Sequence, residues 1–271
     1  MPHLRHRFLT PIIQNALKAS PVVGVLGQRQ TGKTTLTEEA SAEYVTLDDE
    51  DALESALRSA KTYITDRRSP FTIDECQLSP PLFPALKEWC RKHPRPGQFI
   101  LTGSVRFTSV EKIRESLTGR ILDLELLPLC LAECHGHDLL DLRKVARAAQ
   151  PLSYLSARPM AKAGGIAKAQ EFLLKGGLPG ICFLRSNTMR ARKMRSHIKT
   201  ILDRDLRQVI RTDLDYLSLK TFLEELALRQ GRSFELSALA RDSRISINTA
   251  RKLLSGLESV FLIRTVRKTG T

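Results

Sequence analysis

A glycine-rich segment carries the residue types that hold a phosphate group. Residues 27–34 read Gly-Gln-Arg-Gln-Thr-Gly-Lys-Thr and fit the pattern G-x-x-x-x-G-K-[ST] at every fixed position. In such a segment the glycines let backbone N–H groups turn toward phosphate oxygens, Lys33 reaches the β- and γ-phosphates, and the Thr34 hydroxyl binds Mg²⁺. The spacing therefore predicts a site for ATP and Mg²⁺.

The predicted nucleotide contacts form one continuous run that includes the residue after the pattern. The pattern gives roles to the glycines, the lysine and the threonine, whereas chemistry alone assigns no role to Gln28, Arg29 or Gln30. The full run of predicted contacts is Gly27, Gln28, Arg29, Gln30, Thr31, Gly32, Lys33, Thr34 and Thr35.

Two acidic residues follow an apolar triplet further along the chain. Residues 71–73 read Phe-Thr-Ile and precede Asp74 and Glu75, and Asp74 comes 40 positions after Thr34. On their own, two acids after such a triplet are more often a solvated strand end. After a complete phosphate-binding pattern, they predict that Asp74 holds Mg²⁺ together with Thr34. They also predict that Glu75 orients and deprotonates the attacking water.

Two further catalytic candidates stand beside later apolar runs. Ser104 follows residues 99–102 and could sense the γ-phosphate, although an ordinary hydroxyl turn after a strand is an equal alternative. Arg120 precedes residues 121–126 and could act as an arginine finger, either in its own chain or on a neighbouring one. Arg106 is a rival for the same role.

The first half of the chain alternates short apolar runs with amphipathic stretches, which is typical of a parallel sheet flanked by helices. Helices are expected from near residue 32, over 51–60 and over 81–92. We predict one α/β domain of the P-loop NTPase class over residues 1–130, with a five-stranded parallel sheet. Its strands are expected at residues 22–26, 44–47, 71–73, 99–102 and 121–126.

From about residue 128 the pattern changes to helices. We predict a helical segment over residues 131–215, with glycine breaks at 164–165 and 176–180 and a long basic amphipathic helix over 188–210. A winged helix-turn-helix domain is predicted over residues 216–271.

Two short helices around a polar turn carry the winged-helix prediction. Residues 236–241 and 247–257 have helical periodicity, and Ser246 in the turn could cap the second helix. Asn248, Thr249, Arg251 and Lys252 are expected on its outer face, where they could meet a DNA major groove. A module that only packs or contacts protein is the alternative.

The two halves of the chain differ in net charge. The chain carries +14 overall, with 17 Lys/Arg against 16 Asp/Glu in residues 1–130 and 26 against 13 in residues 131–271. This excess favours an acidic partner, such as double-stranded DNA, for the carboxyl-terminal half. Solvated helix faces, or contact with an acidic region of a protein partner or of a second copy, would explain the same charge.

Composition and apolar runs limit the class of protein. Hydrophobic residues make up 42% and charged residues 27%, values typical of folded globular proteins. No run reaches the roughly 18–20 apolar residues that a membrane span needs, and the basic start of the chain leads into no secretion signal. The five cysteines form an odd, scattered set, which favours reduced thiols. We therefore expect a cytoplasmic protein without membrane contact.

A group of cysteines and histidines at residues 130–137 raises the question of a metal site. Cys130, Cys134, His135 and His137 are of the types that bind Zn²⁺, but their spacing is unusual and no second cluster supports them. Packed thiols beside surface histidines are the favoured interpretation.

Eight short stretches match one known group of proteins. They are Gly-Gln-Arg-Gln-Thr-Gly-Lys-Thr-Thr-Leu (27–36), Leu-Asp-Asp (47–49), Ile-Asp-Glu-Cys-Gln (73–77), Phe-Ile-Leu-Thr-Gly-Ser (99–104), Glu-Ser-Leu-Thr-Gly-Arg (115–120), Leu-Pro-Leu (127–129), Gly-Gly-Leu-Pro (176–179) and Asp-Arg-Asp-Leu (203–206). With them the chain resembles prokaryotic AAA-type ATP-binding proteins. In that group an ATPase domain is followed by a winged helix and a domain of unknown function related to nucleases.

The resemblance implies that Glu75 is catalytic, that Ser104 is the first sensor and that Arg120 is the family's motif arginine. It also implies that the strand before Ser104 lies between the strand before the phosphate loop and the strand that ends in Asp74. Members of the group usually continue well past the winged helix, whereas this sequence ends at Thr271. We therefore expect the nuclease-related domain to be missing, and no nuclease-like activity is carried over.

These observations predict an ATPase in which ATP binding and hydrolysis drive a conformational change that is coupled to DNA or to a protein partner. The alternative is a nucleotide-dependent DNA-binding regulator with little or no ATP turnover. A small-molecule kinase is disfavoured because no acceptor-binding lid is visible.

Overall fold

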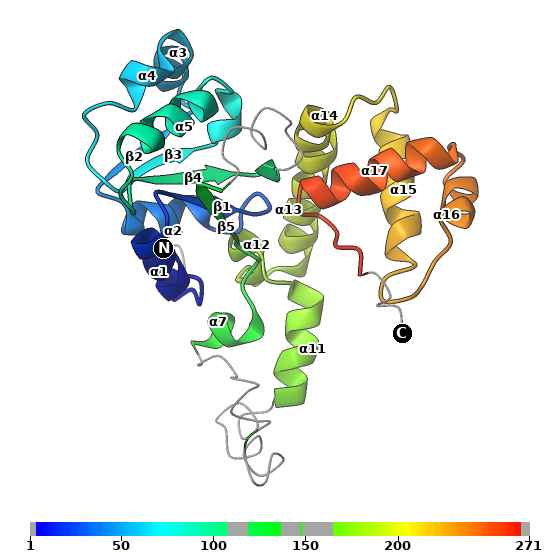
Figure 1. Ribbon diagram of the computed structural model, residues 1–271. Helices are drawn as coiled ribbons and strands as arrows, with labels where there is room; N and C mark the ends of the chain where they lie inside the picture. Colours follow the sequence, from blue (N-terminus) through cyan, green and yellow to red (C-terminus); the bar gives the residue numbers. More distant parts are fainter. Residues whose placement is uncertain (1–3, 108–118, 137–146, 148–164, 267–271) are drawn as a thin grey trace.

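The computed structural model describes residues 4–107, 119–136, 147 and 165–266 (Figure 1). Its first half is built on one parallel sheet of five strands in the order β2-β3-β4-β1-β5. The strands are β1 (Val22–Leu26), β2 (Glu43–Thr46), β3 (Phe71–Asp74), β4 (Phe99–Gly103) and β5 (Ile121–Glu125). The predicted α/β fold with a five-stranded parallel sheet is confirmed, and β4 lies between β1 and β3 as the resemblance implies.

Helices flank this sheet. They are α1 (Thr10–Ala19), α2 (Lys33–Ala40), α3 (Glu50–Arg58), α4 (Ala60–Tyr63), the 3₁₀ turn η1 (Cys76–Leu78) and α5 (Leu82–Lys92). The first of them, α1, is not among the helices expected from the sequence. The single helix expected over residues 51–60 is two helices, because the backbone leaves the helical conformation at Ser59.

The three central strands are buried along their whole length. Every residue of β1, β3 and β4 is buried, which explains why their sequences are rich in apolar residues. Phe83 and Leu86 of α5 pack on one side of the sheet, and Ile13 of α1 and Leu36 of α2 pack on the other. Because all strands are parallel, their carboxyl ends meet at one edge, where the phosphate-binding segment and the two acids lie.

The second half is helical in its described parts. Its elements are α7 (Leu131–His135), α11 (Gly165–Lys175), α12 (Pro179–Cys182), α13 (Asn187–Thr200), the π-helical turn η3 (Ile201–Asp205), α14 (Leu206–Val209), α15 (Tyr216–Ala227), α16 (Leu236–Asp242) and α17 (Ile247–Ser259). The long helix expected over residues 188–210 is the run α13–η3–α14. Among the helices that are described, none has the length and apolar character to cross a membrane.

The helices α16 and α17 form a helix-turn-helix pair. Ser246 caps α17, because its hydroxyl accepts a hydrogen bond from the Thr249 backbone N–H at 3.1 Å. Leu253 and Leu257 of α17 are buried, whereas Arg251 is exposed, so the helix has the inner and outer faces expected from its sequence. Between α17 and residue 266, where the described part ends, there is no strand. The wing of the predicted winged helix therefore stays a prediction.

The run α13–η3–α14 lies between the sheet and the helices α15–α17 (Figure 1). Leu206 packs in the core of the carboxyl-terminal helices. On the other side, Ile201 packs against Val105, which follows β4, and against Val260, which follows α17. The two halves therefore meet at the loop that follows the fourth strand.

Candidate nucleotide-binding site

The segment between β1 and α2 curls tightly because glycine occupies two positions that other residues cannot take. Gly32, at the start of α2, has a φ of 94°, a left-handed conformation that favours glycine. A Cβ atom on Gly27 would lie 2.3 Å from the backbone oxygen of Leu126. Both fixed glycines of the pattern are therefore required by the shape of the loop.

Lys33 closes this loop from within. Its side chain is only 6% exposed, and its Nζ donates hydrogen bonds to the backbone oxygens of Gly27 at 2.9 Å and Gln28 at 3.1 Å. Burial lowers the pKa of Lys33, and the negative charges of Glu75 and Asp74 partly oppose that shift. The ammonium group thus sits at the centre of the loop on carbonyl oxygens that phosphate oxygens could replace.

Asp74 lies opposite the first turn of α2 and accepts hydrogen bonds at both carboxylate oxygens. Thr34 Oγ1 donates to Oδ2 at 2.9 Å, and the hydroxyl of Tyr44 donates to the same oxygen at 2.6 Å. Thr102 Oγ1 and the Glu75 backbone N–H donate to Oδ1. The structure therefore brings together Thr34 and Asp74, the two residues predicted to hold a metal.

The groups around Asp74 fit a magnesium ion. The Thr34 hydroxyl and the Asp74 carboxylate are oxygen ligands, which Mg²⁺ prefers, and they converge at the mouth of a loop shaped for phosphate. Tyr44, which the sequence reasoning missed, orients the carboxylate from β2. Burial raises the pKa of the Tyr44 hydroxyl, as does its hydrogen bond to Asp74, so this group stays a donor at neutral pH.

Glu75 is held in a left-handed conformation directly after β3, with a φ of 52°. Its Oε2 accepts a hydrogen bond from Gln77 Nε2, and the hydroxyl of Ser104 lies 3.5 Å from the same oxygen. The structure therefore places Ser104 beside Glu75, as the sensor and base roles would require. In the sequence, Gln77 was matched only as part of the stretch 73–77. In the structure, its hydrogen bond positions the carboxylate of Glu75.

The protonation of Glu75 should affect folding. Burial raises its pKa above the usual 4.5, although the charge of Lys33 opposes the shift. Because the folded protein then binds this proton more tightly than the unfolded chain, stability falls as pH rises from 4.5 through the raised pKa. We expect Glu75→Gln to melt at a higher temperature than the wild type at pH 7, with the difference vanishing near pH 4. Melting curves followed by circular dichroism at both pH values test this, and a difference independent of pH would contradict it.

Arg120 lies at the opposite edge of the sheet from the loop. Ile121, the residue after it, pairs with Val22 at the start of β1, whereas the loop follows Leu26 at the other end of that strand. Arg120 does not reach the loop of its own chain in this arrangement. A role for it on a neighbouring chain stays a prediction.

Arg106, the rival arginine, joins the two halves. Its guanidinium donates to Glu125 Oε2 at 3.0 Å and to the Glu258 backbone oxygen at 3.1 Å, and it lies over the ring of Phe261 at 4.4 Å from the ring centre. These contacts tie the loop after β4 to the end of α17.

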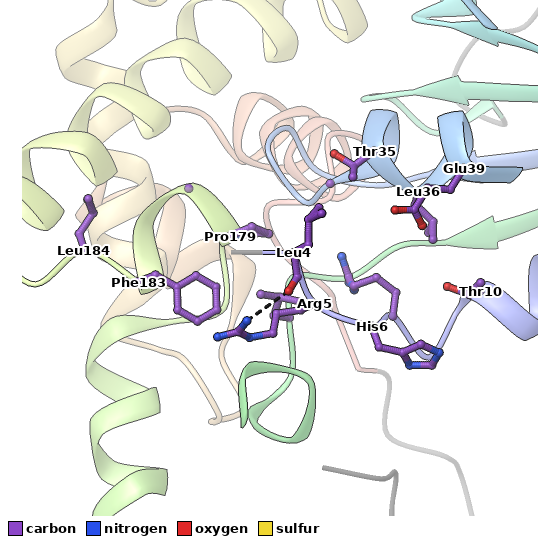
Figure 2. A pocket seen from close by; sticks show the side chains of 14 residues that line it. Leu4, Arg5, His6, Thr10, Thr35, Leu36, Glu39, Pro179, Phe183 and Leu184 are labelled. Carbon is purple, nitrogen blue, oxygen red and sulfur yellow. Dashed lines mark hydrogen bonds between the residues drawn. The ribbon is translucent and has the colours of Figure 1, made fainter. Parts of the chain in front are cut away.

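A cavity of about 610 Å³ opens beside the loop, a size typical of small-ligand pockets. Figure 2 shows Thr35 and Leu36 of α2 on one side, Pro179 and Phe183 on the other, and Leu4 and Arg5 of the amino-terminal segment between them. Of these residues, the sequence predicted Thr35 alone as a ligand contact. The one sequence feature that pointed to the others is the glycine break at residues 176–180.

Arg7 fastens the amino-terminal segment to the loop. Its Nη1 donates to the Thr31 backbone oxygen and its Nη2 to that of Leu127, both at 2.6 Å. Its Nε pairs with Glu133 at 3.1 Å, and the same carboxylate caps α7. The loop is thus braced by a buried ion pair whose partners are distant in sequence.

The structure describes Cys130, Cys134 and His135 of the cysteine and histidine group. His137 lies outside the described residues. Among the side chains that are described, no three His, Cys, Asp or Glu gather in a way that could hold a metal ion.

Two family models match the chain in succession. Residues 19–135 match the AAA domain, and residues 166–271 match a domain of unknown function, DUF8612. The first match spans β1 to α7 and so contains the loop, Asp74, Glu75 and Ser104. The sheet and its phosphate-binding loop therefore lie in the part of the chain that matches an AAA domain.

Two curated relatives match over most of the chain. The uncharacterized protein Rv2008c of Mycobacterium tuberculosis and the uncharacterized protein Mb2031c of Mycobacterium bovis are each 29% identical to it over 255 residues. These alignments cover 93% of this chain and 51% of each relative. The chain thus spans about half the length of the relatives.

Solved structures align over similar shares at low scores. The Walker-type ATPase PABY2304 of Pyrococcus abyssi aligns with 93% of this chain and 96% of its own, at 14% identity and a TM-score of 0.46. RuvB of Thermotoga maritima aligns with 92% of this chain and 86% of its own, at 18% identity and a TM-score of 0.40. At such scores the alignments say nothing about what this chain does.

Proposed function

We propose that this chain binds ATP with Mg²⁺ at residues 27–35 and hydrolyses it to drive a conformational change. The observation that carries the proposal is the hydrogen bond from Thr34 to Asp74 at the mouth of the loop that buries Lys33. It joins two motifs that are 40 positions apart in the sequence. The match of residues 19–135 to the AAA domain supports the same function.

Each residue of the site would have a separate task in ATP hydrolysis. Lys33 would leave the carbonyl oxygens of Gly27 and Gln28 for oxygens of the β- and γ-phosphates. Thr34 and Asp74 would hold Mg²⁺, which when bound neutralises charge on those phosphates. Glu75 would take a proton from water as the water oxygen bonds to the γ-phosphorus and the bond to the β–γ bridging oxygen breaks. Ser104 would align that water.

The cavity beside the loop would take the adenine and ribose. It adjoins Gly32 and Thr35 of the loop, and its wall includes the apolar side chains of Leu36, Leu129 and Phe183. A flat, largely apolar base fits such walls. Bound there, ATP would contact the amino-terminal segment and α12 as well as the loop.

The proposal keeps the division of the chain predicted from the sequence, with an ATPase domain over 1–130, a helical segment over 131–215 and a winged helix over 216–271. The helix-turn-helix pair α16–α17 supports the last of these. Arg120 enters the proposal only as a residue that one copy would offer to the loop of another, because it lies at the far edge of its own sheet.

A nucleotide-dependent DNA-binding regulator is the second candidate. It is favoured by the outer face of the helix-turn-helix pair, where Arg244, Asn248, Arg251 and Lys252 are exposed. Such side chains contact DNA phosphates and bases when a helix of this kind enters the major groove. DNA affinity that depends on ATP in the absence of turnover would favour this candidate over the ATPase.

Nucleotide binding by Lys33→Ala tests the proposed site. Removing charge-assisted hydrogen bonds of this kind costs about 1.5–3 kcal/mol each, so we expect the affinity for Mg·ATP to fall roughly 10- to 100-fold. Isothermal titration calorimetry with the wild type and the variant measures the effect. Lys18→Ala, which changes an exposed lysine of α1, is the matched control. Equal affinity in all three proteins would show that the loop is not the binding site.

A further inference from the structure

Arg29 leaves the phosphate-binding loop and reaches the second half of the chain. Its Nε donates to both carboxylate oxygens of Asp205, at 2.9 and 3.0 Å. Asp205 is 1% exposed and ends the π-helical turn η3. The phosphate-binding pattern gives Arg29 no role. In the structure, Arg29 connects the loop to a buried acid that lies 176 positions away in the sequence.

In the surroundings of this pair, Asp205 depends on Arg29 to balance its negative charge. His197 lies near it on α13, with both ring nitrogens buried and without a hydrogen-bond partner in the structure. Burial lowers the pKa of His197, against the charge of Asp205, so its ring is neutral at pH 7. Within the described part of the chain, Arg29 is the cation that pairs with Asp205.

Arg29 also faces the catalytic groups. The negative charge of Glu75 stabilises the guanidinium of Arg29, and Arg29 belongs to the same loop as Lys33. The γ-phosphate would lie between Lys33 and Glu75, and Nη1 and Nη2 of Arg29 donate to no described residue. The same side chain is thus placed between a buried carboxylate and the expected position of a terminal phosphate.

The turn that carries Asp205 is connected to the rest of the site. A π-helical turn often marks a functional position in a helix, and Ile201 at its start packs against Val105, the neighbour of Ser104. Val260, at the end of the helix-turn-helix pair, joins the same cluster. A change in the position of η3 would therefore reach the last helix of the chain.

We propose that Arg29 reports the γ-phosphate to the second half of the chain by exchanging partners. In the absence of ATP, Arg29 holds Asp205. When ATP binds, Arg29 turns to the γ-phosphate, which guanidinium groups bind well, and the turn η3 is released. ADP lacks this phosphate and leaves the pair intact. The inference rests on the proposed ATP site, and it describes how ATP bound there would affect the second half of the chain.

The exchange predicts that Asp205 competes with triphosphate for Arg29. In Asp205→Asn the competing charge is gone, so the affinity for a non-hydrolysable ATP analogue should rise about tenfold, which matches one charge-assisted hydrogen bond. Its affinity for ADP should stay unchanged. In Arg29→Ala the analogue should lose its advantage over ADP. Asp203→Asn removes a charge from the same turn without touching Arg29 and is the matched control.

Calorimetric titration of the four proteins with Mg·ADP and with the magnesium complex of the analogue measures these affinities. Wild-type affinities for Asp205→Asn, or equal weakening of both nucleotides, would overturn the exchange and leave Asp205 as a structural support. Hydrogen exchange of the wild type gives an independent readout, since residues 201–209 should exchange faster with the analogue than with ADP. Identical exchange in both states would also overturn it. A wild type that binds neither nucleotide would refute the proposed ATP site itself.

Discussion

Replacing Glu75 with glutamine should abolish ATP turnover while the protein still binds Mg·ATP. The amide has the shape of the carboxylate and can keep hydrogen bonds with Gln77 and Ser104, but it cannot take a proton from water. Loss of a general base lowers kcat by about 10²- to 10⁴-fold. Release of inorganic phosphate under saturating ATP measures kcat, and calorimetry measures binding.

The matched control for this variant is Glu54→Gln, which changes an exposed acid on α3. Full turnover in Glu75→Gln would show that another group activates the water. Loss of binding would show that the carboxylate is needed to build the loop. A wild type that binds ATP without measurable turnover would reject the ATPase and favour the DNA-binding regulator.

The parts of the candidate site that the sequence predicts are local in the chain. The loop is eight consecutive residues whose glycines, lysine and threonine have fixed tasks, and the acids directly follow a buried strand. Parallel strands bring such ends to one edge, so Thr34 and Asp74 meet without any information about distant residues. The three central strands are predictable for a similar reason, since burial on both faces leaves sequences rich in apolar residues.

The parts that the sequence could not predict depend on contacts between distant residues. Arg7 binds the Thr31 carbonyl and Glu133, and Arg29 binds Asp205. Nothing in the spacing of these residues indicates a partner, because each pairing is set by the packing of the two halves. Tyr44 was missed because a tyrosine in an edge strand is ordinary until the neighbouring strand places Asp74 beside it.

The cavity next to the loop is a further case in which distant segments meet. Its wall includes Leu129 after β5 and Pro179 at the start of α12. These segments approach closely at Gly177, whose backbone oxygen accepts a hydrogen bond from the Leu129 N–H at 2.8 Å. The glycine break in the sequence is thus one of the places where the second half contacts the first.

Gly177→Ala should therefore destabilise the protein and weaken ATP binding. A Cβ atom there would lie 2.0 Å from the Leu129 backbone oxygen, so residues 176–180 would have to move away from Leu129 and open the cavity wall. Overpacking of this kind costs roughly 1–3 kcal/mol. For a chain of this size that corresponds to a fall of about 2–5 °C in Tm, which differential scanning calorimetry measures.

Gly180→Ala provides the comparison, because Gly180 lies three positions further along the same segment and lines the cavity. Apart from its chain neighbours and the backbone of its own helix, no atom of the described residues lies within 4 Å of a Cβ at Gly180, and alanine within α12 favours the helix by about 1 kcal/mol. We expect this variant to be as stable as the wild type or more so. Since both substitutions add one methyl group beside the cavity, the difference between them isolates the contact with Leu129. Equal melting temperatures for the two variants would show that this contact does not hold the halves together.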